Sequence, residues 1–115
     1  MKKIVILAAI VISAISCTSE SKLAVIKGKT VHYKDKNGAS FRASYGHLSD
    51  RSLHFVKVTM PDGGQYTLPQ LVSASGARYT NERKVIWWEH QGTVRVEIRN
   101  ADGDWETGYS DLKEE

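Results

Sequence analysis

Apolar residues recur at every second position along much of the chain after residue 30, a spacing typical of β-strands with one buried face. The first such segment holds the apolar set Val31, Tyr33, Phe41, Ala43 and Tyr45. Asn37-Gly38 interrupts it, and this pair of residues favours the tight turn of a hairpin. The pattern therefore predicts a β-hairpin over residues 31–45.

A second hairpin is predicted near the middle of the chain. KVIWWE and TVRVEI flank His90-Gln91-Gly92, and the second of these runs alternates strictly, with Val94, Val96 and Ile98 on one face and Arg95 and Glu97 on the other. Alternation also predicts that one of Trp87 and Trp88 lies in the core and the other points outward.

The run at residues 53–60, LHFVKVTM, is less regular. Leu53 and Phe55 follow one phase, whereas Val56, Val58 and Met60 follow the other. This pattern predicts either a β-bulge or a strand that is buried on both faces. Residues 61–64 and 100–103 are rich in Asp and Gly and predict two further turns.

The fold class that follows is all-β, with about eight short antiparallel strands. No window of eleven or more residues beyond the first 16 keeps a helical stripe. Small sheets must protect their edge strands, so a closed barrel or a tight sandwich is expected, and we favour the barrel. An eight-stranded barrel is just filled by its side chains, which argues against a ligand cavity. Its aromatic core is expected from Phe41, Tyr45, Phe55, Tyr66, Trp87 or Trp88, and Trp105.

The first 16 residues have the composition of a signal peptide. Lys2 and Lys3 precede an apolar run that is too short to span a bilayer, and small residues lead to Cys17, the single cysteine of the chain. This arrangement predicts a lipoprotein signal peptide over residues 1–16, an acylated Cys17 followed by a polar tether to residue 22, and one domain over residues 23–115. Thr18 favours the outer membrane, with the domain facing the periplasm. The alternative is an ordinary secreted protein with an unpaired thiol.

Charge changes this picture little. Without Lys2 and Lys3 the 16 basic residues fall to 14, against 13 acidic residues. The remaining charge is uneven, because residues 22–36 are mostly basic and residues 97–115 mostly acidic. Two solvated faces explain this distribution more simply than a field that steers a partner. No motif indicates nucleic-acid binding.

No catalytic or metal site is predicted. Ser73 and Ser75 lack the glycine spacing of a nucleophile elbow. The histidines are too far apart for a zinc motif, and nothing brings the carboxylates together for acid–base chemistry; these residues are His32, His47, His54, His90, Glu82, Glu89, Asp102 and Asp104. We therefore expect a protein that is not an enzyme and that uses no cofactor, no metal ion and no small-molecule substrate.

The stretch LPQLVSASGARYT, residues 68–80, followed by a strand with Trp88 and a turn at HQG, resembles the MliC family of membrane-bound inhibitors of c-type lysozyme. The likeness covers roughly residues 30–98. It implies an eight-stranded antiparallel β-barrel that inserts the 73–79 loop and the 89–92 turn into the active-site cleft of a host lysozyme. A c-type lysozyme is thus the expected protein partner.

The resemblance also implies the residues that bind lysozyme. In the family, the second serine of the SxSG run and a lysine in the later turn reach the enzyme's two catalytic carboxylates. The serine corresponds to Ser75, whereas the lysine position is taken by His90 when the two sequences are anchored on Trp88, or by Glu89 in an ungapped count. We favour His90, because a third carboxylate would be repelled. The complete expected set is Ser73, Ser75, Gly76, Ala77, Arg78, Tyr79, Glu89 and His90.

Several of these residues have simpler explanations. Gly76 is as well explained by a turn with positive φ as by close approach to a partner. Arg78 and Tyr79 are expected to brace the loop through hydrogen bonds to its carbonyl groups rather than to touch the enzyme. A histidine in place of lysine predicts inhibition that depends on pH, because an unperturbed histidine gains its proton near pH 6.5.

The chain departs from the family in having no cysteine after residue 17, where a disulfide is common. A natural disulfide in a small secreted domain contributes typically about 2–5 kcal/mol, so lower stability is expected here. Together with the lost lysine and the small net charge, this departure keeps a second hypothesis open: a binding module of the same fold for another partner in the cell envelope.

Overall fold

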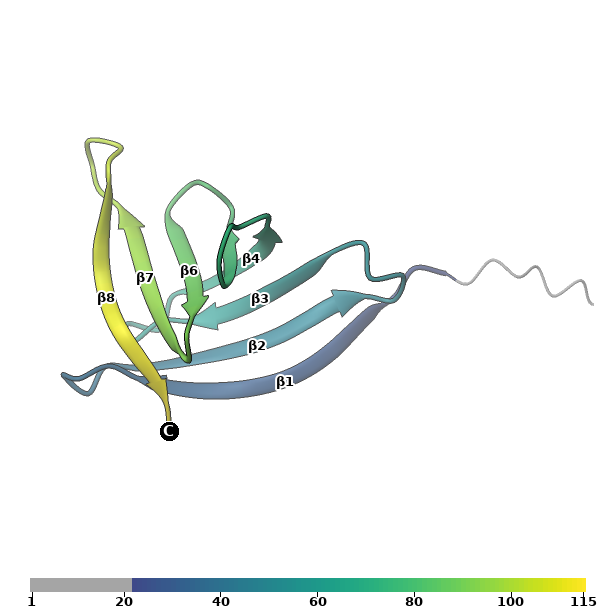
Figure 1. Ribbon diagram of the computed structural model, residues 1–115, viewed down its shortest axis with the longest axis horizontal. Coiled ribbons are helices and arrows are strands. Elements are labelled where there is room, and N and C mark those ends of the chain that lie inside the picture. Colours follow the sequence, from purple (N-terminus) through teal and green to yellow (C-terminus); the bar gives the residue numbers. More distant parts are fainter. Residues whose placement is uncertain (1–21) are drawn as a thin grey trace, which may run out of the picture.

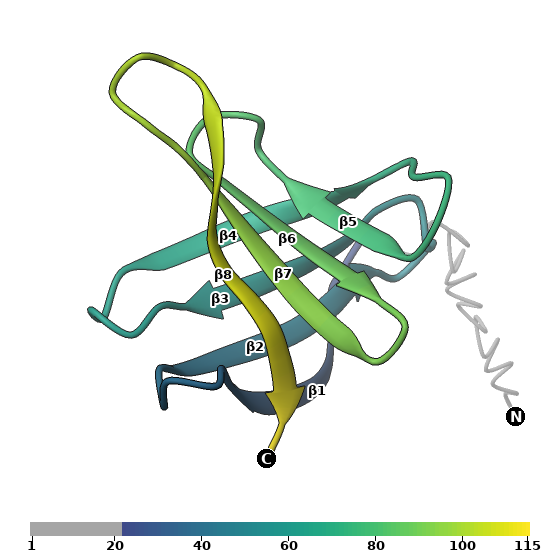
Figure 2. The same ribbon diagram turned by 60° about the vertical axis from the view of Figure 1, so that its left-hand side comes forward.

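The computed structural model describes residues 22–115, which form a closed antiparallel β-barrel (Figures 1 and 2). Each strand pairs with the next along the chain, and the last returns to the first. The predicted signal peptide and Cys17 lie outside the described residues. Within residues 22–115 no helix could cross a membrane. The eight strands are β1 (Val25–Lys34), β2 (Ser40–Leu48), β3 (His54–Thr59), β4 (Gln65–Leu71), β5 (Ala77–Thr80), β6 (Val85–His90), β7 (Thr93–Arg99) and β8 (Trp105–Glu114).

Both predicted hairpins are confirmed. In the first, Val31 pairs with Ala43 and Tyr33 with Phe41. The Asp35 carboxylate accepts hydrogen bonds from the backbone N–H groups of Asn37 (2.9 Å) and Ala39 (2.8 Å), which fixes the turn. In the second, β6 and β7 pair from Val85–Ile98 to His90–Thr93, and Gln91 and Gly92 both have positive φ, as a tight two-residue turn requires.

Side chains fill the interior of the barrel. Trp87 lies at its centre with no exposed surface, packed edge-on against Tyr33 with ring centroids 5.4 Å apart and tilted against Phe41 at 6.0 Å. Trp88 is partly exposed, so alternation placed the two tryptophans correctly. The buried cluster comprises Val31, Tyr33, Phe41, Ala43, Val56, Val58, Met60, Leu68, Tyr79, Val85, Trp87, Val94, Val96 and Leu112.

The prediction for residues 53–60 was wrong. β3 pairs with β2 and β4 without any register shift, so it contains no bulge. Its inner face carries Val56 and Val58, whereas Phe55 faces outward and is only partly buried. Phe55 is held there because its ring lies against Gly46 of β2, where a side chain would leave it no room. The irregular positions are instead in β1, between Lys27 and Thr30, and between β7 and β8.

Two of the expected aromatic core residues therefore lie outside the core. Phe55 is one, and the other is Trp105, which is partly exposed and stacks under the Arg99 guanidinium at 4.5 Å. Phe41 and Trp87 belong to the buried cluster, and Tyr45 and Tyr66 pack against it. Outward aromatic residues of this kind follow the same alternation as core ones, so alternation alone does not separate them.

The strands are strongly staggered. β1 closes the barrel on β8 through only two residue pairs near its C-terminal end, Tyr33–Glu114 and Lys34–Lys113. Its N-terminal half pairs with β2 alone and is exposed throughout residues 22–30. This hairpin therefore extends beyond the rest of the barrel (Figure 1).

Candidate functional site

The serine-bearing loop is shorter than the sequence predicted. It comprises residues 72–76, between the end of β4 at Leu71 and the start of β5 at Ala77. Ala77, Arg78 and Tyr79 are strand residues that pair with β6, so the expected loop over residues 73–79 is corrected to its first half. Tyr79 is a core residue with 8% of its surface exposed. Neither its ring nor the β5 backbone belongs to the projecting loop.

Gly76 fixes how the loop joins β5. Its φ of +69° lies in the left-handed region, and a Cβ atom there would overlap the backbone carbonyl oxygen of Glu89. Two requirements thus coincide at one residue, since glycine alone tolerates both the dihedral and the close approach. The approach is made to β6 of the same chain, which holds the loop against the strand that carries Trp88 and His90.

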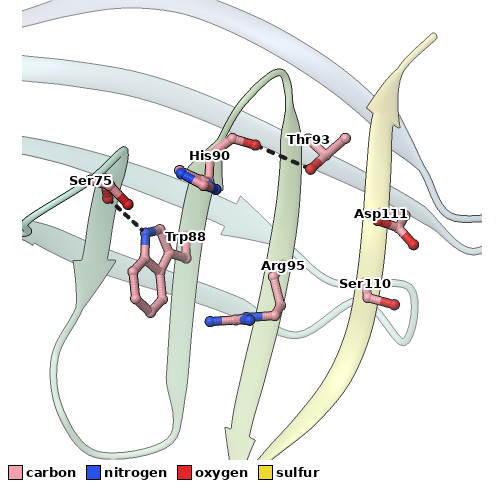
Figure 3. Close-up of a pocket in the computed structure, with 7 residues that line it drawn as sticks. All are labelled: Ser75, Trp88, His90, Thr93, Arg95, Ser110 and Asp111. Carbon is pink, nitrogen blue, oxygen red and sulfur yellow. Dashed lines mark hydrogen bonds between the residues drawn. The ribbon is translucent and has the colours of Figure 1, made fainter.

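The loop is braced through the carbonyl group of Ser75. The Ser73 hydroxyl donates to this oxygen at 2.7 Å, and the indole Nε1–H of Trp88 donates to it at 3.1 Å (Figure 3). The bracing that we expected from Arg78 and Tyr79 is therefore supplied by Ser73 and Trp88. Both hydrogen bonds are made to the carbonyl oxygen of Ser75. Within residues 22–115, the hydroxyl group of this exposed residue is not used to shape the loop.

His90 lies beside this loop, at the exposed end of β6. Its carbonyl oxygen accepts a hydrogen bond from the Thr93 hydroxyl at 3.2 Å, which closes the turn. Ser75 and His90 line the same open pocket of about 450 Å³. Figure 3 shows its lining side chains, which come from the loop, β6, β7 and β8: Ser75, Trp88, His90, Thr93, Arg95, Ser110 and Asp111.

Arg95 adds a fixed positive charge to the pocket. It is paired directly with Trp88 across β6 and β7, and its guanidinium carbon lies 4.9 Å from the centroid of the indole ring. Cation–π contact of this kind holds a guanidinium while leaving its N–H groups free to bind an anion. The Glu97 carboxylate is 3.9 Å from Arg95 Nε, which is too long for a hydrogen bond between the two groups.

Glu89, the other candidate for the family's lysine position, faces a different environment. It shares the inward face of β6 with Val85 and Trp87 and is partly buried near tyrosine side chains. Burial raises the pKa of its carboxyl above the ordinary 4.5, an effect partly offset by hydrogen bonding to Tyr45 and by the charge of Lys29. Burial and the Glu89 charge together raise the pKa of Tyr79 to about 12. Of the two candidates, His90 is the one that shares a pocket with Ser75.

Several residues at this site were not predicted. Val72 is fully exposed in the loop, which is unusual for valine. The proximity of Arg95 follows from the hairpin register, since a two-residue turn after His90 places it opposite Trp88. Ser110 and Asp111 carry no comparable signal, because the register of β8 shifts beside Val94 and Val96 and Asp111 has a positive φ of 56°. Within residues 22–115 no group of three potential metal ligands comes together.

Comparison with known proteins identifies the family. Residues 33–105, more than half of the chain, match the family described as membrane-bound lysozyme-inhibitor of c-type lysozyme, MliC. The chain belongs to the MliC family. The match includes the MliC loop at residues 72–76, the paired strands β6 and β7, and every strand residue of the pocket before β8.

One curated MliC relative is the membrane-bound lysozyme inhibitor of C-type lysozyme from Pseudomonas aeruginosa, strain PAO1, which is 34% identical over 80 residues. The alignment covers 70% of this chain and 57% of the relative, so the chain spans just over half the length of that protein. No solved structure matches the chain.

Proposed function

We propose that this MliC protein inhibits a c-type lysozyme by placing the 72–76 loop and the turn after His90 in the active-site cleft of the enzyme. The observation that carries the proposal is that Ser75, in the 72–76 loop, and His90, at the end of β6, line one pocket. The loop is supported by the hydrogen bond from the Ser73 hydroxyl and by the close approach of Gly76 to the Glu89 carbonyl. It projects from the strand that contains Ala77, Arg78 and Tyr79.

The chemistry of the target fits these donors. Lysozyme is the standard case of a glycosidase with two carboxyl groups, one with a raised pKa and one ionised, about 5 Å apart. A serine hydroxyl and an imidazole N–H can both donate to such a pair. The loop is held by the Trp88 hydrogen bond and by Gly76 before any partner binds, so little conformational entropy is lost on insertion.

The test is a titration of the soluble domain, residues 18–115, against c-type lysozyme activity. Ser75→Ala and His90→Ala should each weaken inhibition about tenfold or more, since a hydrogen bond to a charged group contributes roughly 1.5–3 kcal/mol. Arg42→Ala is the matched control, because Arg42 is an exposed residue of the β1–β2 hairpin outside the pocket, and it should leave inhibition unchanged.

The same titration at pH 5 and pH 8 tests the expected role of the imidazole. Inhibition by the natural chain should be stronger at pH 5, where a histidine is more often charged, and His90→Ala should remove most of the difference. Arg95 and Asp111 are the other charged residues that line the pocket. Inhibition that does not change between the two pH values would reject this role.

Two specific observations favour a second function. The family lysine is absent, and the domain is close to neutral, which gives it little long-range attraction to a basic enzyme. On this hypothesis the pocket binds a different partner in the envelope. The two are separated by the titration, because a module of the second kind leaves lysozyme activity unchanged even at high concentration.

We also propose that the mature chain is a lipoprotein acylated at Cys17, held in the outer membrane with its domain facing the periplasm. The proposed action requires no catalysis, cofactor, metal ion, nucleic acid or small-molecule substrate.

A further inference from the structure

The hairpin extension at the start of the domain exposes an unusual amount of apolar surface. We define it as the tip, residues 22–27 with residues 46–55. Four of its aliphatic side chains are strongly exposed, namely Leu23 (58%), Val25 (58%), Ile26 (42%) and Leu53 (37%). Val25 and Ile26 are consecutive in a strand and so point to opposite faces. The tip is therefore apolar on both faces and at its end.

This surface is rigidly built. Ala24 and Ser49 are joined by two hydrogen bonds, Ala24 N to Ser49 Oγ at 3.0 Å and Ser49 N to Ala24 O at 2.8 Å. Leu48 N donates to Leu53 O at 2.9 Å, and Val25 pairs with Leu48. The exposed aliphatic residues are thus presented by an ordered hairpin, with no loss of backbone entropy required for them to meet a partner.

A groove of about 480 Å³ runs along the outer face from the tip toward β4. Gly28 and Gly46 supply little bulk along it, Val25 and Phe55 provide its apolar walls, and the lysine pair Lys27 and Lys57 stands beside them. Aliphatic and aromatic side chains flanked by lysines form the amphipathic composition that binds the headgroup region of a bilayer.

The charge of the tip is one-sided. Lys22, Lys27 and Arg51 are balanced there only by Asp50, and the neighbouring strand positions add Lys29 and Lys57. The acidic residues of the domain are concentrated elsewhere, in residues 97–115. An anionic phospholipid surface is complementary to this end of the molecule and not to the other.

The length of chain before the tip points to the same partner. Cys17 precedes Lys22 by five residues, which span at most roughly 18 Å when fully extended. If Cys17 is acylated, the tip cannot move farther than this from the lipid headgroups. We propose that the tip rests on the anionic phospholipid surface in which the chain is anchored and so fixes the orientation of the domain. This inference rests on the proposed lipid anchor.

The experiment uses the complete acylated lipoprotein in vesicles of phosphatidylethanolamine and phosphatidylglycerol. Leu53→Cys provides a single reactive thiol for an environment-sensitive fluorophore, and Ala101→Cys, in the exposed turn between β7 and β8, provides the control. The label at residue 53 should shift to the blue and be quenched by nitroxide-bearing lipids, whereas the label at residue 101 should behave as in water. Equal behaviour of the two labels would overturn the proposal.

Charge variants test the recognition of anionic lipid. Lys27→Gln and Lys57→Gln should each lower the equilibrium constant for docking of the tip, measured with the label at residue 53, about fivefold. Lys84→Gln, in the exposed segment before β6, should have no effect. Replacing phosphatidylglycerol by phosphatidylcholine should produce the same loss as the charge variants. Docking that is unchanged in phosphatidylcholine would reject the lysine contribution.

Three measurements distinguish failure of this proposal from failure of the proposed lipid anchor or of the proposed lysozyme inhibition. Mass spectrometry of the N-terminal peptide reports acylation at Cys17, and inhibition of lysozyme is measured on the same vesicles. If Cys17 carries no lipid, the tip-labelled domain of residues 18–115 should still bind phosphatidylglycerol vesicles at high lipid concentration, and no spectral shift there would overturn the proposal. If inhibition is absent but the tip label is quenched, the membrane contact stands and the lysozyme partner does not.

Discussion

Glu89 is a carboxylate at the boundary between the pocket and the core. Gly76 packs against its backbone carbonyl group. Its side chain lies near Tyr45 and Tyr79, whose rings meet edge-on with centroids 5.9 Å apart. Burial raises the pKa of its carboxyl in the folded chain. Ionisation of this group therefore opposes folding, although its backbone position is essential to the shape of the loop.

The sign of this effect predicts a measurable pH dependence. Because the pKa of Glu89 is higher in the folded chain than in the unfolded chain, its contribution to stability is most favourable below pH 4.5 and is lost as the pH rises through the raised value. Glu89→Gln keeps a hydrogen-bonding group and cannot ionise, so it should flatten the slope over this interval and increase the stability at pH 7. Urea unfolding at pH 4 to 8 measures both effects, with exposed Glu82→Gln as the control. A steeper slope in Glu89→Gln would contradict the assignment.

At the scale of single residues, the sequence was informative where geometry is local. A charge argument favoured His90 over Glu89 for the family's lysine position, and the structure places His90 in one pocket with Ser75. Which of the two residues takes the role of the lysine stays a prediction. Phe55 and Trp105 were misplaced because alternation gives the period of a strand and not the face that meets the core. The register shifts that bring Asp111 to the pocket depend on how β8 closes the barrel, which no short motif encodes.

At the scale of elements, the loop between β4 and β5 depends on its junction with β6. The existence of the β6–β7 hairpin could be predicted from its alternation, but the sequence analysis counted His90 in the turn, whereas the structure places it at the end of β6. The two-residue turn at Gln91 and Gly92 then fixes the register of every pair that follows. The bounds of the β4–β5 connection could not be predicted, because the composition of residues 77–79 is typical of a loop. These residues form a strand only because they pair with Trp87, Trp88 and Glu89. The pocket is a product of that pairing.

Gly76→Ala should show how much of the binding surface rests on this junction. The left-handed backbone costs an alanine about 1–2 kcal/mol, and its Cβ would also overlap the Glu89 carbonyl, which must move. The variant should lose more stability than that and should weaken inhibition about tenfold or more.

Gly63→Ala is a matched control for this change, since Gly63 has a φ of +89° but nothing lies within 4 Å of an added Cβ. It should lose only the backbone contribution and keep full inhibition. Thermal unfolding and the lysozyme titration are carried out on both variants. The comparison separates the cost of the left-handed backbone from the cost of the overlap with the Glu89 carbonyl. Equal losses in the two would show that the approach to Glu89 is unimportant.

At the scale of the whole molecule, closure rests on a narrow seam. β1 and β8 share two residue pairs, as few as β4 and β5, whereas the other neighbouring strands share four or more. Residues 22–115 contain no cysteine that could bridge β1 and β8. Besides its pairing with β7, β8 is anchored by the side chain of Leu112, which lies opposite Val94 and is completely buried in the core. The closed barrel is therefore maintained by packing at its last strand.

Leu112→Ala should consequently destabilise the entire domain. Truncating a buried leucine costs about 2–5 kcal/mol, a large fraction of the roughly 5–15 kcal/mol that stabilises an ordinary small domain. Ile26→Ala, at the exposed tip, removes a residue of similar size and should change the free energy of unfolding by less than about 0.5 kcal/mol. Urea denaturation compares the two, and a similar loss in both would mean that β8 does not close the core. Because the pocket draws Ser110 and Asp111 from this strand, Leu112→Ala should also weaken inhibition under conditions in which most molecules remain folded.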